Sequence, residues 1–131
     1  MIYGIGIDLV AITRMHDNLE RYGGRFANRI LSSEEMHEYA AAFSPAQFLA
    51  KHFAAKEALV KALGTGFRDG VSLKDISINH GLMGQPRINC TGRLSEIMQT
   101  NDITSSHLTL SDEKDYACAC VILEKNVRTD I

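Results

Sequence analysis

Residues 45–66 read PAQFLAKHFAAKEALVKALGTG, and this stretch predicts the longest helix of the chain. Ser44 and Pro45 form a helix start, because serine caps the first turn and proline is favoured at the first helical position. The alanines raise helix propensity, and the large apolar residues recur at helical spacing. Glycine is a common helix stop, so Gly64 marks the end. We expect a helix from about Pro45 to Leu63 at the centre of the fold.

The N-terminal residues 2–10, IYGIGIDLV, predict a strand, because apolar side chains alternate with two glycines and an aspartate. Glycines on one face of a strand indicate that another segment or a ligand approaches the backbone closely there. Asp8 shares that face and would project into the space that Gly4 and Gly6 leave open. The alternative for Asp8 is a capping role at the helix that begins near Ala11.

The remaining pattern changes from helical to strand-like along the chain. Helical spacing covers residues 11–22, and Ser32 with Glu35 forms a capping-box pattern that opens a helix through about Phe43. Strand-like segments follow at 76–79, 85–90, 107–111 and 116–123, with a short helix at 91–100 and frayed residues at 126–131. We predict one α+β domain over residues 1–131, with the long central helix packed on an antiparallel sheet.

Composition and charge narrow the class of protein. The 131 residues are 45% hydrophobic and 23% charged, which is typical of a globular protein. No apolar run approaches the ~18–20 residues of a membrane span, and Asp8 breaks the N-terminal segment too early for a signal peptide. The three cysteines include no CxxC pair and predict reduced, buried thiols in a cytoplasmic protein. The five histidines lack the spacing of zinc ligands.

The net charge of −2 disfavours a general nucleic-acid-binding protein, which usually carries a basic excess. The charge is nevertheless uneven: it is +2 over residues 12–30, +3 over 51–68 and −3 over 101–131. This asymmetry indicates a specific anionic partner for the N-terminal half.

A candidate binding site combines the strand and the long helix. Glu57 and Lys61 lie four residues apart on one helix face, a spacing that alone is also typical of a surface ion pair. Asp8 and Glu57 would come together if the strand packs on the helix, and two carboxylates with phosphate oxygens and waters commonly hold Mg²⁺. Lys56 and Lys61 could balance further phosphate charge. The sequence therefore predicts a magnesium-polyphosphate site.

Two neighbouring features could contribute to the same site. The glycine-flanked loop Gly64-Thr65-Gly66 could offer backbone N–H groups to phosphate oxygens, although it follows a helix and is not a Walker A loop. His52 lies beside the lysines and could contact a phosphate; placement in the core or at the surface is the alternative.

Three segments together resemble the holo-acyl-carrier-protein synthases, the small phosphopantetheinyl transferases. They are GIGIDLVAITR at 4–14, FAAKEALVKALGTG at 53–66 and HLTLSDEKDYACACVILE at 107–124. The resemblance implies transfer of the 4′-phosphopantetheine arm of coenzyme A to a serine of apo-acyl carrier protein, in support of fatty acid biosynthesis. The other product would be adenosine 3′,5′-bisphosphate.

The resemblance also implies roles for individual residues. Asp8 and Glu57 would hold Mg²⁺ on the coenzyme pyrophosphate, and Lys61 would stabilise the charge that develops during transfer. The serine proton would pass to a metal-bound water held by Glu57, or to Glu57 directly. Further contacts to the coenzyme are expected from Lys56, His52, Gly64, Thr65 and Gly66.

The partners follow from the same resemblance. Arg14, Arg21 and Arg25 lie near one helical face and would dock the acidic carrier protein, with a solvated basic face as the alternative for the last two. Relatives form homotrimers with active sites between subunits, and the apolar strand 116–123 is compatible with an interface or with a simple core. Two other functions remain open at this point: a module that binds coenzyme A without catalysis, and a protein that only docks acidic helices.

The chain departs from the family pattern in two places. Many members carry Gly-Arg where Lys51-His52 stands, so the contact to the 3′-phosphate of the coenzyme is expected to differ. Many carry Ser-His-Thr where this chain has Ser111-Asp112-Glu113, which removes a histidine that a neighbouring subunit could contribute.

Overall fold

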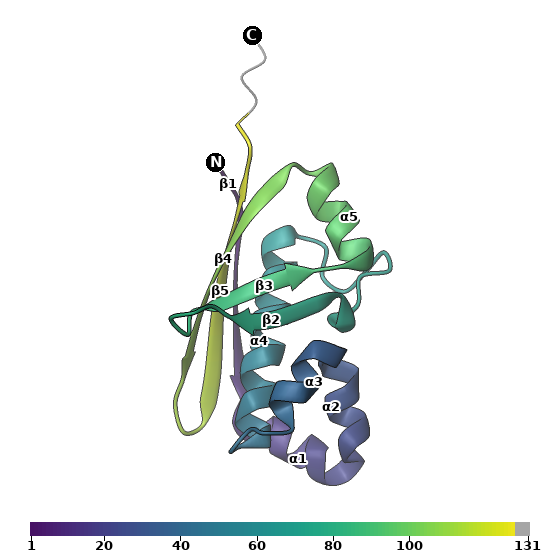
Figure 1. Ribbon diagram of the computed structural model, residues 1–131, viewed down its shortest axis with the longest axis vertical. Coiled ribbons are helices and arrows are strands. Elements are labelled where there is room, and N and C mark those ends of the chain that lie inside the picture. Colours follow the sequence, from purple (N-terminus) through teal and green to yellow (C-terminus); the bar gives the residue numbers. More distant parts are fainter. Residues whose placement is uncertain (128–131) are drawn as a thin grey trace.

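The computed structural model describes residues 1–127 and contains five α-helices, a short 3-10 helix and five strands (Figure 1). In chain order they are β1 (Ile2–Ala11), α1 (Ile12–Tyr22), α2 (Gly24–Ile30), α3 (Ser33–Tyr39), α4 (Pro45–Leu63), η1 (Leu73–Asp75), β2 (Ile76–His80), β3 (Pro86–Cys90), α5 (Gly92–Thr100), β4 (Ile103–Asp112) and β5 (Tyr116–Lys125). We expected residues 126–131 to be frayed, and of these, residues 128–131 lie outside the described residues.

The strands form two antiparallel sheets. The larger has the order β1-β5-β4, and the smaller pairs β2 with β3. Helix α4 packs along one face of the larger sheet, while α1, α2 and α3 gather at one end of the molecule (Figure 1). The predicted α+β fold, with a long central helix on an antiparallel sheet, is therefore confirmed.

The glycine face of β1 is where the sheet and α4 touch. A Cβ atom added to Gly4 would lie 1.9 Å from the carbonyl oxygen of Ala62, and one added to Gly6 would lie 1.9 Å from that of Ala58. Such distances are impossible for a real side chain, so only glycine permits this approach. The predicted close approach is confirmed, and α4 is the segment that makes it.

The opposite face of β1 and β5 is apolar, and no segment within residues 1–127 covers it. Ile5, Ile7 and Leu9 are about 60% exposed, at 61%, 60% and 63%. The strand register places side chains of β5 beside them, and we call the whole set the outer sheet face: Ile5, Ile7, Leu9, Tyr116, Cys118, Cys120 and Ile122. All three cysteines are free as predicted, but they are half-buried rather than buried. For Cys118 and Cys120 the reason is that no segment within the described residues covers this face.

Three elements differ from the sequence-based expectation. The helix α2 was not expected; it begins at Gly24, directly after Gly23 has turned the chain with a φ of 61°. The helix α3 ends at Tyr39 rather than near Phe43. Strand β4 begins at Ile103 because its polar first half pairs with β5, a constraint that local alternation does not reveal.

Within residues 1–127, no helix is long and apolar enough to cross a membrane.

Candidate active site at the contact of β1 and α4

Asp8 and Lys61 meet where β1 packs on α4. The Lys61 ammonium donates a hydrogen bond to Asp8 Oδ1 at 2.8 Å and another to the carbonyl oxygen of Ile7 at 3.1 Å. The Asp8 side chain is 16% exposed, whereas that of Lys61 is 51% exposed, so the pair lies at the rim of the contact. The hydrogen bond to Asp8 raises the pKa of Lys61, which keeps its positive charge at neutral pH.

Glu57 shares the electrostatic environment of this pair. Burial raises the pKa of the half-buried Glu57, and the nearby negative charge of Asp8 raises it further. The positive charges of Lys61 and Arg14 act in the opposite direction. The structure thus brings together the two carboxylates and the lysine that the sequence predicted, with Arg14 as an additional cation near them.

The glycine loop after α4 does not present its N–H groups as predicted. The N–H groups of Gly64 and Gly66 both donate to the carbonyl oxygen of Val60, at 3.0 Å and 3.3 Å, and so cap the helix. The Thr65 hydroxyl donates to the carbonyl oxygen of Gly66 at 2.8 Å. The expectation that these two glycine N–H groups are free for phosphate is therefore wrong, although the loop itself follows Lys61 within one turn.

The phosphate contact predicted for Lys56 is also wrong. This lysine is fully buried, and its ammonium donates to Glu35 Oε1 and to the carbonyl oxygens of Ile30 and Leu73, at 2.6, 2.6 and 3.1 Å. An ammonium has three donors, and all of them are used inside the protein. Lys56 therefore has no donor left for a ligand.

His52 is buried as well, so its predicted phosphate contact is wrong and core placement is observed. Its Nδ1 atom hydrogen bonds to Glu35 Oε2, and its ring stacks on Phe48 with centroids 4.0 Å apart. We call Glu35, His52 and Lys56 the Glu35 cluster. The capping box of Ser32 and Glu35 was predicted correctly. The Glu35 carboxylate also binds His52 and Lys56 on α4, which the sequence did not indicate.

The predicted docking arginines lie on the exposed surface of α1 and α2. The Arg14 guanidinium lies over the ring of Phe53 and that of Arg21 over the ring of Tyr22, at 5.6 Å and 5.4 Å from the ring centroids. Arg25 lines a cavity of about 310 Å³ together with Asn18, Tyr22, Phe26 and Arg29. Sequence reasoning did not place Arg29 in this group, because the helix α2 that positions it was not expected.

The hairpin that joins β4 to β5 is attached to the start of α4, since the Gln47 side-chain amide donates to the Asp112 carboxylate.

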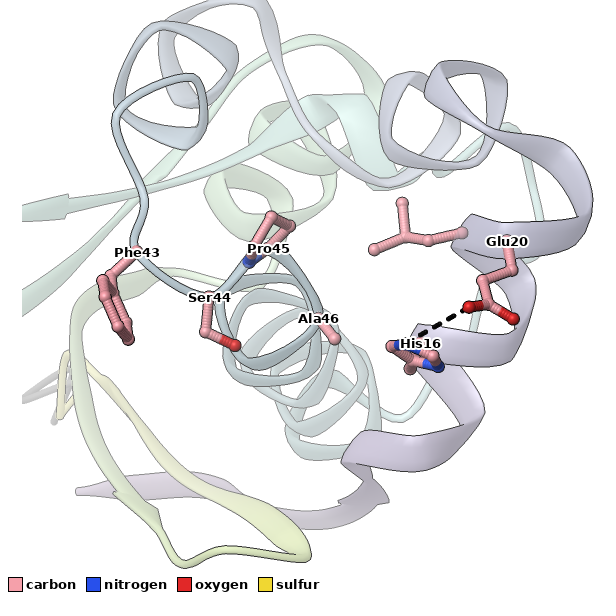
Figure 2. Close-up of a pocket in the computed structure, with 7 residues that line it drawn as sticks. His16, Glu20, Phe43, Ser44, Pro45 and Ala46 are labelled. Atoms are coloured by element: carbon pink, nitrogen blue, oxygen red, sulfur yellow. Dashed lines mark ion pairs between the residues drawn. The ribbon is translucent and has the colours of Figure 1, made fainter.

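A separate open cavity of about 470 Å³ lies between α1 and the start of α4 (Figure 2). It is lined by His16, Leu19, Glu20, Phe43, Ser44, Pro45 and Ala46. None of the residues that the sequence assigned to the site lines this cavity, so it is distinct from the carboxylate pair.

Comparison with known proteins identifies the class to which this geometry belongs. Residues 4–121 match the 4′-phosphopantetheinyl transferase superfamily, and the chain belongs to that superfamily. A holo-[acyl-carrier-protein] synthase from Nitrosospira multiformis is 54% identical over 125 residues, covering 95% of this chain and 100% of the relative.

Solved structures agree with this assignment. The holo-[acyl-carrier-protein] synthase of Neisseria meningitidis is 43% identical with a TM-score of 0.91, covering 95% of this chain and 100% of its own. The enzyme of Helicobacter pylori, solved in complex with coenzyme A, is 31% identical with a TM-score of 0.80, covering 92% of this chain and 99% of its own.

The Glu35 cluster predicts a measurable acid dependence of stability. Burial alone would raise the pKa of Glu35, but the hydrogen bond from His52 and the Lys56 charge outweigh it and lower the pKa from 4.5 to about 2. A carboxyl with a lowered pKa stabilises the fold above its unfolded value and loses that contribution as pH falls. We expect the free energy of unfolding to fall between pH 4.5 and about 2, and denaturant titrations of Glu35→Gln to show a weaker fall. An equal fall in both proteins would contradict this assignment.

Proposed function

We propose that this chain transfers the 4′-phosphopantetheine arm of coenzyme A to a serine of apo-acyl carrier protein. The observation that carries the proposal is the convergence of Asp8, Glu57 and Lys61 at the contact of β1 and α4. Membership of the 4′-phosphopantetheinyl transferase superfamily supports the reaction type. The synthase relatives support acyl carrier protein as the acceptor, and the complex from Helicobacter pylori supports coenzyme A as the donor.

The carboxylate pair fits Mg²⁺. Burial raises the pKa of Glu57 and the neighbouring Asp8 carboxylate raises it further, and a bound cation would relieve the repulsion between the two carboxylates. Among residues 1–127, no group of three or more His, Cys, Asp and Glu side chains could hold a metal. Asp8 and Glu57 would therefore supply only part of the ligand shell, which suits Mg²⁺ because it commonly keeps waters and substrate phosphates as ligands.

The residues of the site have separate roles in the proposed reaction. The serine oxygen forms a bond to the phosphorus that carries pantetheine, the bond from that phosphorus to the bridging oxygen breaks, and adenosine 3′,5′-bisphosphate leaves. Mg²⁺, when bound, offsets the charge on the phosphate oxygens. Lys61 stabilises the charge that grows on the leaving oxygen. The serine proton passes to Glu57, either directly or through a water that Glu57 holds.

The loop of Gly64, Thr65 and Gly66 is proposed as part of the coenzyme-binding surface because it follows Lys61 within one turn of the helix. Its glycine N–H groups already cap α4, so its contribution lies in the shape of the loop and in Thr65 rather than in free N–H donors from the two glycines.

The arginines of α1 and α2 are proposed as the docking surface for the carrier protein. Arg14, Arg21 and Arg25 are exposed, and Arg14 lies close enough to lower the pKa of Glu57. A serine held near Glu57 by a protein docked on Arg14 would therefore reach the carboxylate site. An acidic protein is the complementary partner of this surface.

The outer sheet face is proposed as the interface of a homotrimer with active sites between subunits. Three large aliphatic side chains of β1 are about 60% exposed in one copy, at 61%, 60% and 63%, and together with their β5 neighbours they form a contiguous apolar surface. Such surfaces commonly mark contacts between proteins.

A cytoplasmic location stays a prediction.

The transfer reaction predicts a mass change. Apo-acyl carrier protein incubated with this protein, coenzyme A and Mg²⁺ should gain about 340 Da by mass spectrometry. Asp8→Ala should abolish the gain, because it removes a metal ligand and the partner of Lys61. The control Glu96→Ala removes an exposed carboxylate on α5 and should leave transfer unchanged. No gain with several carrier proteins would contradict the proposal, and coenzyme binding without any gain would favour a non-catalytic binding module.

The docking surface predicts a salt-dependent loss of affinity. Arg14→Ala should raise the KM for carrier protein about fivefold, roughly 1 kcal/mol, and the difference should shrink as salt is added. Arg93→Ala on α5 is the control, because that arginine is exposed and paired with Glu96 away from α1. Equal KM values for both variants at low salt would show that the carrier docks elsewhere.

The trimer proposal predicts a change in molecular mass. Light scattering should give a trimer for the wild type and a smaller species for Ile7→Asp, because a charge would then be placed in the apolar interface. Leu82→Asp replaces a more exposed apolar residue in the turn after β2 and should leave the trimer intact. A monomeric wild type would refute the proposed assembly.

A further inference from the structure

We propose that the Glu35 cluster is a positioning device for the active site, and the proposal rests on the proposed function. The cluster fixes the orientation of α4 about its own axis, so that Glu57 and Lys61 face Asp8. Glu35, His52 and Lys56 do not touch the substrate in this proposal. They act through the helix that carries Glu57 and Lys61.

The helix α4 carries two pairs of polar residues on different faces. His52 and Lys56 are four residues apart and both contact Glu35. Glu57 and Lys61 are also four apart, and they share the neighbourhood of Asp8. An α-helix turns about 100° per residue, so Lys56 and Glu57 point in directions about 100° apart. A rotation of α4 that broke the first pair of contacts would also turn the second pair away from Asp8.

The close approach of α4 to Gly4 and Gly6 does not fix this orientation by itself. Ala58 and Ala62 of α4 lie against Gly6 and Gly4, so at the glycines the interface consists of small residues on the helix and bare backbone on the strand. It sets how closely the helix approaches the sheet. Side chains that interlock restrict rotation, and this side of the helix offers none larger than a methyl group to the two glycines.

The Glu35 cluster supplies directional contacts that the alanine face lacks. The Glu35 carboxylate accepts hydrogen bonds from the backbone N–H groups of Ser32 and Ile78, at 2.9 Å and 3.2 Å, in addition to those from Lys56 and His52. The Lys56 ammonium also binds the carbonyl oxygens of Ile30 and Leu73.

These bonds connect α4 to four other parts of the fold: the end of α2, the start of α3, η1 and β2. Lys56 directly precedes Glu57 in the chain, so a displacement of its backbone also moves Glu57. The cluster thereby links the position of a catalytic side chain to the packing of these four parts of the fold.

Stability alone does not account for a buried ion pair at this place. Removing two charges from water is costly, and apolar side chains of similar volume often stabilise a core as well or better. Buried polar groups can instead select one arrangement among several that pack similarly. The nearly fully buried cluster, with every donor of Lys56 satisfied, fits such a selective role.

The test compares variants of the cluster with a variant outside it that is expected to lower the free energy of unfolding by a similar amount. Lys56→Met and Glu35→Gln each remove one charge of the pair, and Leu94→Ala creates a cavity at a fully buried residue of α5. All are assayed well below their thermal midpoints. We expect at least a tenfold lower kcat and a higher Mg²⁺ concentration for half-maximal activity in the cluster variants, with little change in the KM for coenzyme A. Leu94→Ala should keep wild-type kinetics.

A second readout does not depend on transfer activity. Backbone amide NMR shifts of Asp8 and Lys61 should move in both cluster variants and stay in place in Leu94→Ala. If the cluster variants do not fold, Glu35→Asp and Lys56→Arg, which keep the charges but alter side-chain length, should show smaller changes in the same direction. Kinetics and shifts like those of Leu94→Ala in all folded cluster variants would overturn the proposal. If the wild type transfers nothing but the shifts still move, the proposed function fails while the positioning role stands.

Discussion

The close packing of the α4 backbone against Gly4 and Gly6 of β1 is the contact on which the site depends. A single Cβ at either glycine would lie 1.9 Å from a carbonyl oxygen of the helix. This contact brings Asp8, the next residue on the same face of β1, to Lys61 and into the field of Glu57. The candidate active site is therefore a consequence of how one strand and one helix pack, and no long loop is needed to assemble it.

Two other features of the molecule, one buried and one exposed, lie on either side of this contact. On one side of α4, the Glu35 cluster joins the helix to α2, α3, η1 and β2. On the far side of β1, the residues that alternate with the glycines form the outer sheet face. The same strand thus positions an acidic site with one face and presents an apolar surface for association with the other.

Much of the site could be predicted from the sequence because its signals are local. Alternation placed Asp8 on the glycine face, and the helical spacing of four placed Glu57 and Lys61 together. The burial of Lys56 and His52 could not be predicted in the same way, because their partner Glu35 lies 21 and 17 residues away from them in the chain. A lysine beside a candidate carboxylate suggests a ligand contact, and only the packing of α3 on α4 shows that this lysine is buried.

The most direct measurement compares Gly6→Ala with Gly24→Ala in denaturant unfolding and in carrier-protein transfer. A Cβ at Gly24 would meet nothing within 4 Å, so this variant controls for the loss of glycine itself. Gly6→Ala should lower the free energy of unfolding by about 2 kcal/mol or more and sharply reduce transfer by the folded protein, because the helix must move away from Asp8. Equal stability and equal transfer in the two variants would contradict the dependence of the site on this contact.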